Sequence, residues 1–287
     1  MSCGSIFASQ KPEINKGVER YMIGKIRTGL ALFWMVAASL VLVPLQLISM
    51  KTGLWPETVI LKIWHRAMLK ALGMRVHVVG EMVKTRPLMI ASNHISWTDI
   101  MAMGSRFDVT FIAKSELNGW PIFGFLSRLQ RTVFIERERK RKSGDQASEI
   151  ARRLAAGNAM VLFAEGSTGD GNMLLPFKST LFGAASMAIA EGAAEHVVIQ
   201  PVSIAYTRIH GIPLGRQHRP LASWIGDMDL VPHVGQLLAE GGLDVEIRFG
   251  EPIDFSAKSS RKEATRLMEE RVRDMMQQSL GQPLPAR

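Results

Sequence analysis

The feature that most constrains this chain is a long apolar run over residues 28–50, which holds no charged residue and lies between Arg27 and Lys51. About 20 apolar residues are enough to cross a hydrocarbon core of roughly 30 Å. The run therefore predicts a membrane-anchoring helix. The alternative is a helix buried inside a soluble domain. A cleaved signal peptide fits poorly, because the run is too long and no small-x-small cleavage site follows it.

The charges before this run predict its orientation. Lys16, Arg20, Lys25 and Arg27 are among the cations that precede it. Because cytoplasmic segments carry an excess of lysine and arginine, we expect the N-terminal end to stay on the cytoplasmic side. Residues 1–27 are accordingly predicted to form a basic N-terminal segment.

A second helix is expected between Pro56 and Gly73. Proline is favoured in a first helical turn and glycine at a helix C-terminus. Here apolar side chains alternate with lysine, arginine and histidine, which is typical of a helix at a membrane interface rather than of a second span. Two topologies are open. Either the first helix crosses the bilayer, or Pro44 kinks it and the two helices form a hairpin in one leaflet.

The overall charge narrows the possible partners. With a net charge of +9, the chain suits nucleic acid, an anionic membrane surface or an acidic carrier protein. The densest basic run, residues 137–142, has no interleaved aromatic side chains, and no nucleic-acid-binding module accompanies it. We therefore predict membrane lipids and a carrier protein as partners, and no nucleic acid. The oligomeric state is not predicted.

Several kinds of chemistry are disfavoured by what the sequence lacks. Cys3 is the only cysteine, so the chain has no internal disulfide, and neither a cysteine-based zinc site nor a cysteine nucleophile is expected. The histidines show no metal-ligating spacing. No G-x-S-x-G elbow or P-loop lysine motif is present, which argues against a serine esterase and an ATPase. We predict no metal and no bound cofactor.

Beyond Gly73 the sequence alternates between short apolar runs and helical stretches. Strands are predicted over residues 75–79, 87–91, 109–113, 132–135, 160–164, 197–204 and 245–250. Helices are predicted over residues 97–104, 122–129, 146–156, 181–191, 230–240 and 260–280. Alternation of this kind, with largely apolar strands, predicts an α/β fold: a mixed, mostly parallel sheet flanked by helices.

The segment LMIASNHISWTD (residues 88–99) carries the strongest candidate for chemistry. A strand ends at Ser92, and Ser96 with Asp99 resembles a capping box at the start of a helix. His94 would then lie in the turn, where the Asp99 carboxylate can reach back to its imidazole. Such a pair can take a proton and support the resulting imidazolium. On spacing alone, Asp99 could equally be no more than a helix cap.

Four blocks in order give the motif a context. They are NHISWTD (93–99), AKSEL with VFIER (113–117 and 133–137), FAEGST (163–168) and VIQPVSI (198–204). Together they resemble the glycerolipid acyltransferase family, typified by 1-acylglycerol-3-phosphate acyltransferases, over about residues 60–210. The resemblance implies an acyltransferase catalytic domain over residues 74–287, with residues 28–73 as membrane anchor and interfacial helix.

Carried onto this sequence, the resemblance makes His94 the general base and Asp99 the residue that orients it. His94 would take the proton of an acceptor hydroxyl while that oxygen attacks a thioester carbonyl. No acyl-enzyme is needed, because a thioester is already activated. Lys114 would lie near the developing oxyanion or a carrier phosphate; on its own it is simply a lysine that follows a strand.

The remaining site residues are implied to position the acceptor. Arg137 and Glu165 would contact it, and Gly166 would let the backbone approach closely. Asn93 would order the turn before His94. Taken alone, Glu165 is a carboxylate in a turn.

One position departs from the family pattern. The third block commonly continues Glu-Gly-Thr-Arg, but here Ser167 and Thr168 follow Gly166. Thr168 removes a bidentate partner for a phosphate. The longer run FAEGSTGDGNMLLPFKSTLFGAA is similar to bacterial acyltransferases that complete ornithine lipids, whose lyso-ornithine acceptor carries a 3-hydroxyacyl group and no phosphate. We prefer that acceptor to lysophosphatidic acid, although Lys178 or Arg137 could still serve a phosphate.

The resemblance also implies a donor and a location. The donor would be a thioester of acyl carrier protein or coenzyme A, which favours the helical hairpin, with the catalytic domain on the cytoplasmic face of a bacterial inner membrane. Acyl chain length is not predicted. Two alternatives remain: a non-catalytic, membrane-anchored lipid-binding protein on the same fold, and a hydrolase or thioesterase in which water replaces the lipid hydroxyl.

Overall fold

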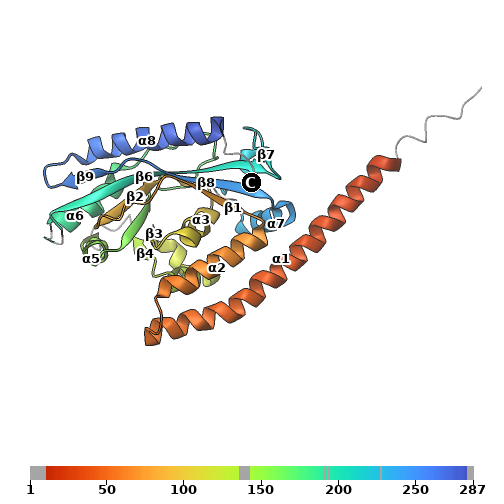
Figure 1. Ribbon diagram of the computed structural model, residues 1–287, viewed down its shortest axis with the longest axis horizontal. Coiled ribbons are helices and arrows are strands. Elements are labelled where there is room, and N and C mark those ends of the chain that lie inside the picture. Colours follow the sequence, from red (N-terminus) through yellow and green to blue (C-terminus); the bar gives the residue numbers. More distant parts are fainter. Residues whose placement is uncertain (1–10, 136–142, 191, 193, 227, 283–287) are drawn as a thin grey trace, which may run out of the picture.

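The computed structural model describes residues 11–135, 143–190, 192, 194–226 and 228–282. These residues form a central sheet with helices on both faces (Figure 1). The expected α/β class is confirmed, and beyond Gly73 each predicted strand and helix is present with its ends displaced by a few residues. The largest displacement there is in β6, which continues to Ile209. The N-terminal helix begins at Lys11, well before the apolar run, so the described part of the basic segment is helical.

The strands lie in the order β1-β8-β6-β2-β5-β3-β4. Their bounds are β1 Arg75–Val79, β2 Leu88–Ser92, β3 Thr110–Lys114, β4 Val133–Ile135, β5 Ala159–Phe163, β6 His196–Ile209 and β8 Leu243–Phe249. From β6 to β4 every pairing is parallel, whereas β8 runs antiparallel to β6 and parallel to β1. The sheet is therefore mixed and mostly parallel, as the sequence predicts.

Two short strands were not predicted. β9 (Ile253–Ser256) pairs antiparallel with the start of β6, and β7 (Ile212–Pro213) pairs with its end. β7 has two residues, one of them a proline, and β9 has an exposed aspartate at its second position. β7 is too short to show a pattern, and the four-residue alternation of β9, with Phe255 buried, is easily missed between Pro252 and the turn that follows.

Alternation along the strands builds two cores, one on each face. Leu88 and Ile90 belong to the core beneath α2 (Glu57–Leu72), α3 (Thr98–Arg106) and α7 (Leu230–Glu240). Met89 and Ala91 belong to the core beneath α5 (Ser143–Ala155), α6 (Gly183–Ala190) and α8 (Arg261–Gly281). All five residues of β2 are buried, as expected for a parallel strand covered on both sides. The remaining short elements are α4 (Pro121–Leu129) and 3₁₀ turns at Ser115–Gly119, Ser179–Phe182 and Arg219–Leu221.

The N-terminal helices form an antiparallel pair. α1 (Lys11–Thr52) continues through Pro44, and α2 returns along it (Figure 1). The indole Nε1 of Trp34 on α1 donates to the carbonyl of Ala67 at 3.1 Å, and Nε1 of Trp64 on α2 donates to the Ser39 hydroxyl at 3.0 Å. The pair lies on the same face of the sheet as α3.

α1 has the character of a membrane helix. Its segment Met22–Thr52 is long and apolar enough to cross a bilayer, and only 11% of its most apolar window is buried. Large apolar side chains such as Phe33 (73% exposed) and Leu40 (71% exposed) face outward. A core helix of a soluble domain would bury such side chains, so α1 is suited to membrane anchoring.

Arg27 fastens α1 to the rest of the molecule. Its guanidinium donates to the carbonyl of Leu72 at 3.2 Å and to that of Leu238 at 2.8 Å. These carbonyls lie in the last turns of α2 and α7, where backbone oxygens lack helical partners and the helix dipole favours a cation. One side chain thus joins three helices.

Candidate active site

The predicted site residues follow neighbouring strands. Because β2, β5, β3 and β4 are parallel, their carboxyl ends share one edge of the sheet, the position where open α/β sheets bind ligands. His94 follows β2, Glu165 follows β5, and Lys114 is the last residue of β3. The side chain of Lys114, all of Arg137 and the basic run 137–142 lie outside the described residues.

Asn93 attaches the turn after β2 to strand β6. Its amide Nδ2 donates to the carbonyl of Ile204 at 2.8 Å, and its Oδ1 accepts from the Ile204 N–H at 2.7 Å. The side chain is buried. Asn93 therefore continues the hydrogen-bonding pattern of the sheet beyond the end of β2, and this holds the next residue, His94, in place.

The imidazole of His94 and the carboxylate of Asp99 are in contact. Nδ1 of His94 lies 2.8 Å from Oδ2 of Asp99. The Asp99 side chain is fully buried, while that of His94 keeps 18% of its surface exposed. The ring of Phe163 stacks on the imidazole with centroids 3.9 Å apart. One edge of the imidazole is thus held by protein, and the Nε2 edge points away from Asp99.

Asp99 accepts three further hydrogen bonds. Its Oδ2 accepts from the backbone N–H groups of Ile95 (2.7 Å) and Ser96 (3.0 Å). Its Oδ1 accepts from the hydroxyl of Tyr206 at 2.8 Å. Each oxygen of this buried carboxylate is therefore used, and its orientation toward His94 is fixed.

The predicted capping box is only half formed. Asp99 reaches back to the Ser96 N–H, but the N–H of Asp99 donates to the carbonyl of Ser96, not to its hydroxyl. Helix α3 begins at Thr98, one residue later than a capping serine at position 96 requires. The assignment of Ser96 as the cap was wrong, because the Asp99 carboxylate spans the turn and also serves His94.

Tyr206 is a site residue that the sequence did not single out. It is buried, and burial together with the nearby Asp99 charge raises the pKa of its phenol well above the usual value. The hydroxyl therefore stays protonated and donates a hydrogen bond to Asp99. It also lies 2.5 Å from the Thr98 hydroxyl. Alternation along β6 was the available signal, since it places Tyr206 on the same face as Ile204.

Glu165 is a buried carboxyl next to the His94 turn. Its Oε1 lies 3.4 Å from the Leu175 N–H, and the His94 backbone also bonds to the side chain. Burial raises the pKa of Glu165 to about 8, against the lowering effect of those two bonds, and the charge of Asp99 adds to the rise. Its Oε2 is buried and has no hydrogen-bond partner among the described residues. At neutral pH Glu165 is thus mostly a neutral acid with a proton to donate.

The loop after β5 closes over the His94 turn. Gly166 has a φ of +75°, which glycine adopts without strain. The Gly169 N–H donates to the carbonyl of His94 at 2.8 Å. Ser167 is exposed, and the hydroxyl of Thr168 donates to the carbonyl of Trp224. Thr168 is therefore tied to another loop, and the threonine supplies no positive charge to the site.

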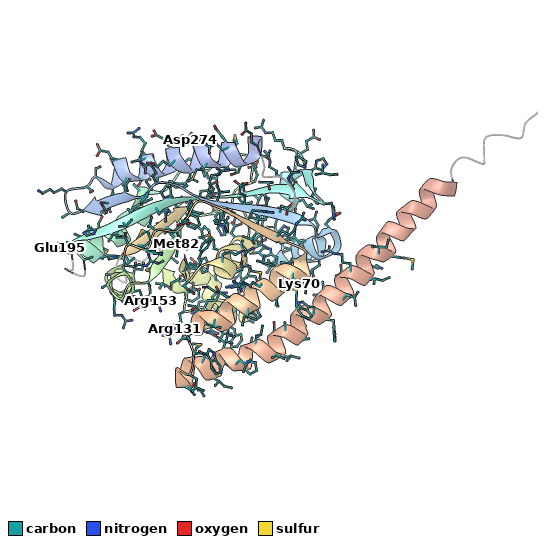
Figure 2. All side chains as sticks on the ribbon, in the orientation of Figure 1. Lys70, Met82, Arg131, Arg153, Glu195 and Asp274 are labelled. Atoms are coloured by element: carbon teal, nitrogen blue, oxygen red, sulfur yellow. The ribbon has the colours of Figure 1, made fainter. Side chains whose placement is uncertain are left out.

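A hollow lies away from this site, between α1 and α2. It has a volume of about 610 Å³ and is lined mainly by apolar side chains, together with Arg27 and Lys70. Figure 2 marks Lys70 on α2, on the side along which α1 runs, and its Nζ lies 5.6 Å from the ring centre of Trp34. Within the described parts of the chain, no group of three His, Cys, Asp or Glu residues is placed to hold a metal ion.

Comparisons with known proteins show which family this chain resembles over most of its length. Residues 75–205 match the acyltransferase family model. The lyso-ornithine lipid O-acyltransferase of Brucella abortus (strain 2308) is 49% identical over 92% of this chain and 99% of its own length. The protein of the same name from Rhizobium meliloti (strain 1021) is 46% identical over 92% of this chain and 94% of its own.

A solved structure shares the fold. The crystal structure of the 1-acyl-sn-glycerophosphate acyltransferase PlsC from Thermotoga maritima superposes with a TM-score of 0.64, covering 93% of this chain and all of that one at 21% sequence identity. That likeness supports the architecture, and the two relatives of nearly full length establish the family. The resemblance inferred from the four sequence blocks is confirmed: this chain is an enzyme that belongs to the acyltransferase family.

Proposed function

We propose that this enzyme transfers a fatty acyl group from a thioester to the free hydroxyl of lyso-ornithine lipid. The observation that carries the proposal is the contact of 2.8 Å between His94 Nδ1 and the buried carboxylate of Asp99. It leaves Nε2 as the ring nitrogen able to take a proton. The names of the relatives that align over nearly the whole chain support the choice of acceptor.

The chemistry follows from the tautomer that Asp99 selects. With Nδ1–H donating to Asp99, the Nε2 lone pair accepts the proton of the acceptor hydroxyl. The hydroxyl oxygen attacks the thioester carbonyl and forms a tetrahedral intermediate. The carbon–sulfur bond then breaks, and the leaving thiolate takes the proton back from Nε2. The products are an ester and a free thiol, and no covalent enzyme intermediate forms.

The surrounding groups support the imidazolium that exists between these two steps. Asp99 carries the compensating negative charge, and Tyr206 holds its Oδ1 from the opposite side. A positioned pair of this kind needs little reorganisation when charge develops on the ring. The role of Tyr206 is therefore positioning, because it acts through Asp99.

Glu165 and Gly166 are proposed to position the acceptor. A protonated Glu165 can donate a hydrogen bond to a carbonyl or hydroxyl of the lipid, and the glycine lets that lipid approach the backbone. Lys114 is proposed at the same sheet edge, where its charge would stabilise the oxyanion or a carrier phosphate. Arg137 is proposed to contact the acceptor as well.

The proposed acceptor agrees with the residue at position 168. A phosphate acceptor would benefit from a bidentate arginine there, and this chain has a threonine with its hydroxyl bonded to Trp224. Lyso-ornithine lipid carries no phosphate and does not need that partner.

The donor and the membrane side are also proposed. Acyl carrier proteins are acidic, and the net charge of +9 suits one as the donor; coenzyme A, which is also anionic, is the alternative. Both donors are cytoplasmic, so we place the catalytic domain on the cytoplasmic face of a bacterial inner membrane, held there by the α1–α2 hairpin.

A competition between acceptors tests the proposal. The purified enzyme would receive acyl carrier protein charged with a fatty acid, together with equal amounts of lyso-ornithine lipid and lysophosphatidic acid. We expect acylation of the ornithine lipid, with the fatty acid attached as an ester. Exclusive use of lysophosphatidic acid would overturn the acceptor assignment. Release of free fatty acid without any lipid product would instead favour a thioesterase.

A further inference from the structure

The acceptor proposed above has a charged end that none of the four sequence blocks matches. When the α-amino group of ornithine is acylated, the headgroup keeps an α-carboxylate and a side-chain ammonium. A carboxylate near the active site calls for a cation, preferably a guanidinium that can bind both oxygens. Thr168 cannot provide it. The partner must come from another part of the chain.

Arg219 is a partly buried cation with an unused donor. Its Nη1 donates to the Asn172 Oδ1 at 3.0 Å. Its Nε is buried and has no hydrogen-bond partner among the described residues. Partial burial and the neighbouring charge of Arg216 lower the pKa of Arg219, whereas Asp170 raises it. Burying a guanidinium donor without a partner is unfavourable, and a bound anion would remove that cost.

Two loops hold Arg219 beside the catalytic turn. The N–H of Trp224 donates to the carbonyl of Ile95 at 3.0 Å, which fixes the segment after Arg219 against the residue that follows His94. Gly171 lies between the two segments. If it carried a Cβ atom, that atom would lie 3.5 Å from the Ile95 side chain and 3.8 Å from the Cβ of Arg219. The Arg219 backbone and the His94 turn are therefore near neighbours across the loop that follows β5.

The loop that follows β5 also carries an acidic side chain, Asp170. Asp170 accepts from the N–H groups of Asn172 at 2.9 Å and Met173 at 3.2 Å, so its carboxylate has a fixed place close to Arg219. The two opposite charges are bridged by Asn172, which bonds to both side chains. Such a pair complements a zwitterion better than it complements a phosphate, which carries only negative charge.

We propose that Arg219 binds the α-carboxylate of the lyso-ornithine headgroup and that Asp170 attracts its ammonium. This proposal rests on the function proposed above and adds the residues that select the headgroup. The hydroxyl to be acylated lies on a 3-hydroxyacyl chain, so a short amide linkage separates it from the carboxylate. A headgroup site beside Ile95 therefore allows the hydroxyl to reach His94 in the same complex.

Comparing two acceptors on several variants tests the inference. The acceptors are lyso-ornithine lipid and its α-methyl ester, which keeps the reactive hydroxyl and the ammonium but lacks the carboxylate charge. For the wild-type enzyme we expect the ester to raise KM at least tenfold, the size of effect for losing a charge-assisted hydrogen bond (about 10- to 100-fold). For Arg219→Gln we expect the two acceptors to give nearly equal KM values, with kcat changed less than KM.

Matched variants separate binding from folding. Arg216→Gln removes the same charge from an exposed residue in the same loop and should keep the full preference for the acid. Arg219→Lys keeps the charge without the bidentate geometry and should restore part of the preference. Thermal unfolding in detergent identifies any variant that fails to fold, and Asn172→Ala then provides a second variant that keeps both charges but removes the side chain that bonds to Arg219 and Asp170.

The outcomes distinguish the two proposals. If the wild-type enzyme uses lyso-ornithine lipid but Arg219→Gln still prefers the acid tenfold, the headgroup site is wrong and the function stands. The same holds if the wild-type enzyme does not distinguish the acid from the ester. If the wild-type enzyme does not acylate lyso-ornithine lipid at all, both proposals fall together.

Discussion

The ring of Phe163 lies nearly parallel to the imidazole of His94, with an interplanar angle of 12°. Phe163 is the last residue of β5, and β5 pairs with β2, the strand that leads into His94. The stack covers one face of the imidazole, and the bond to Asp99 fixes the ring edge. Two strands and a helix therefore determine where the Nε2 atom points.

Loss of this stack should lower turnover more than it weakens binding. Phe163→Leu keeps apolar cover but no flat surface, and we expect kcat to fall about tenfold, because small errors in orientation are costly in a positioned site. In Phe163→Ala we expect kcat to fall further. The free energy of unfolding should also decrease by about 3–5 kcal/mol, which is typical of a buried phenylalanine. Steady-state kinetics and thermal unfolding check both. A wild-type kcat in Phe163→Leu would show that the stack does not orient the base.

Replacement of the proposed base should nearly abolish transfer. For His94→Ala we expect a loss of about 10²- to 10⁴-fold in kcat, the usual contribution of a general base. Membrane association should stay close to wild type and the protein should still fold, because Asp99 keeps its three other hydrogen-bond donors. His196→Ala, at the exposed start of β6, is the matched control. Substantial activity in His94→Ala, above about a tenth of wild type, would refute the assignment of the base.

The Asp99 network predicts a graded pair of effects. Asp99→Asn keeps the shape but no longer selects the Nδ1–H tautomer or balances the imidazolium, so kcat should fall at least about 100-fold. Tyr206→Phe removes one donor to Asp99 and should cost about 1–3 kcal/mol of stability, with a smaller loss of kcat. The ranking of the two kcat values is the measurement. Equal losses would mean that Tyr206 does more than position Asp99.

The raised pKa of Glu165 predicts how stability depends on pH. Burial moves that pKa from 4.5 to about 8, so between these values the folded protein holds a proton that the unfolded chain has released. Rising pH therefore destabilises the fold across this window, by at most about 1.4 kcal/mol per pH unit, and the effect levels off above pH 8. Glu165→Gln should remove this slope. Denaturant unfolding from pH 5 to 9 provides the comparison.

The same protonation state predicts the activity of that variant. Because the neutral acid and the amide have similar shape and both can donate, Glu165→Gln should keep kcat within about tenfold of wild type at pH 7. Glu165→Ala should show a larger decrease in kcat, because alanine cannot donate a hydrogen bond. If Gln and Ala variants are equally inactive, the charged form of Glu165 is the one that matters.

Restoration of the family arginine should change acceptor preference. Thr168→Arg should raise kcat/KM for lysophosphatidic acid by about tenfold, since a bidentate guanidinium binds phosphate well. Ser167→Arg adds the same charge at the exposed neighbouring position and should have a smaller effect. An unchanged ratio of the two acceptors in Thr168→Arg would mean that position 168 does not face the headgroup.

The sequence predicted the layers and strands because both depend on local patterns. β2 and β5 are short, wholly apolar runs, and such runs form strands when helices cover both faces. α7 has the bounds that its pattern predicted, residues 230–240, and α2 ends before a glycine in the left-handed region. The strands missed, β7 and β9, are not runs of this kind, and both pair with β6.

The site was predictable only where its residues are close in sequence. His94 and Asp99 are five residues apart, so a turn and a helix bring them together. Tyr206 meets Asp99 from β6, more than one hundred residues further along the chain, and no spacing in the sequence indicates that contact. Arg219 approaches through a loop whose course depends on Trp224 and Ile95. Contacts between distant segments of this kind require the folded structure.

The three-helix junction at Arg27 has a mechanical consequence. A catalytic domain on a loose tether would sample many heights and tilts above a bilayer. Here a side chain of α1 bonds to carbonyls at the ends of α2 and α7, and these bonds restrict the tilt of α1 relative to the catalytic domain. In a bilayer, the imidazole would then stand at a constant depth, and lipids would be sorted by how far their hydroxyl lies from the midplane as well as by their charge.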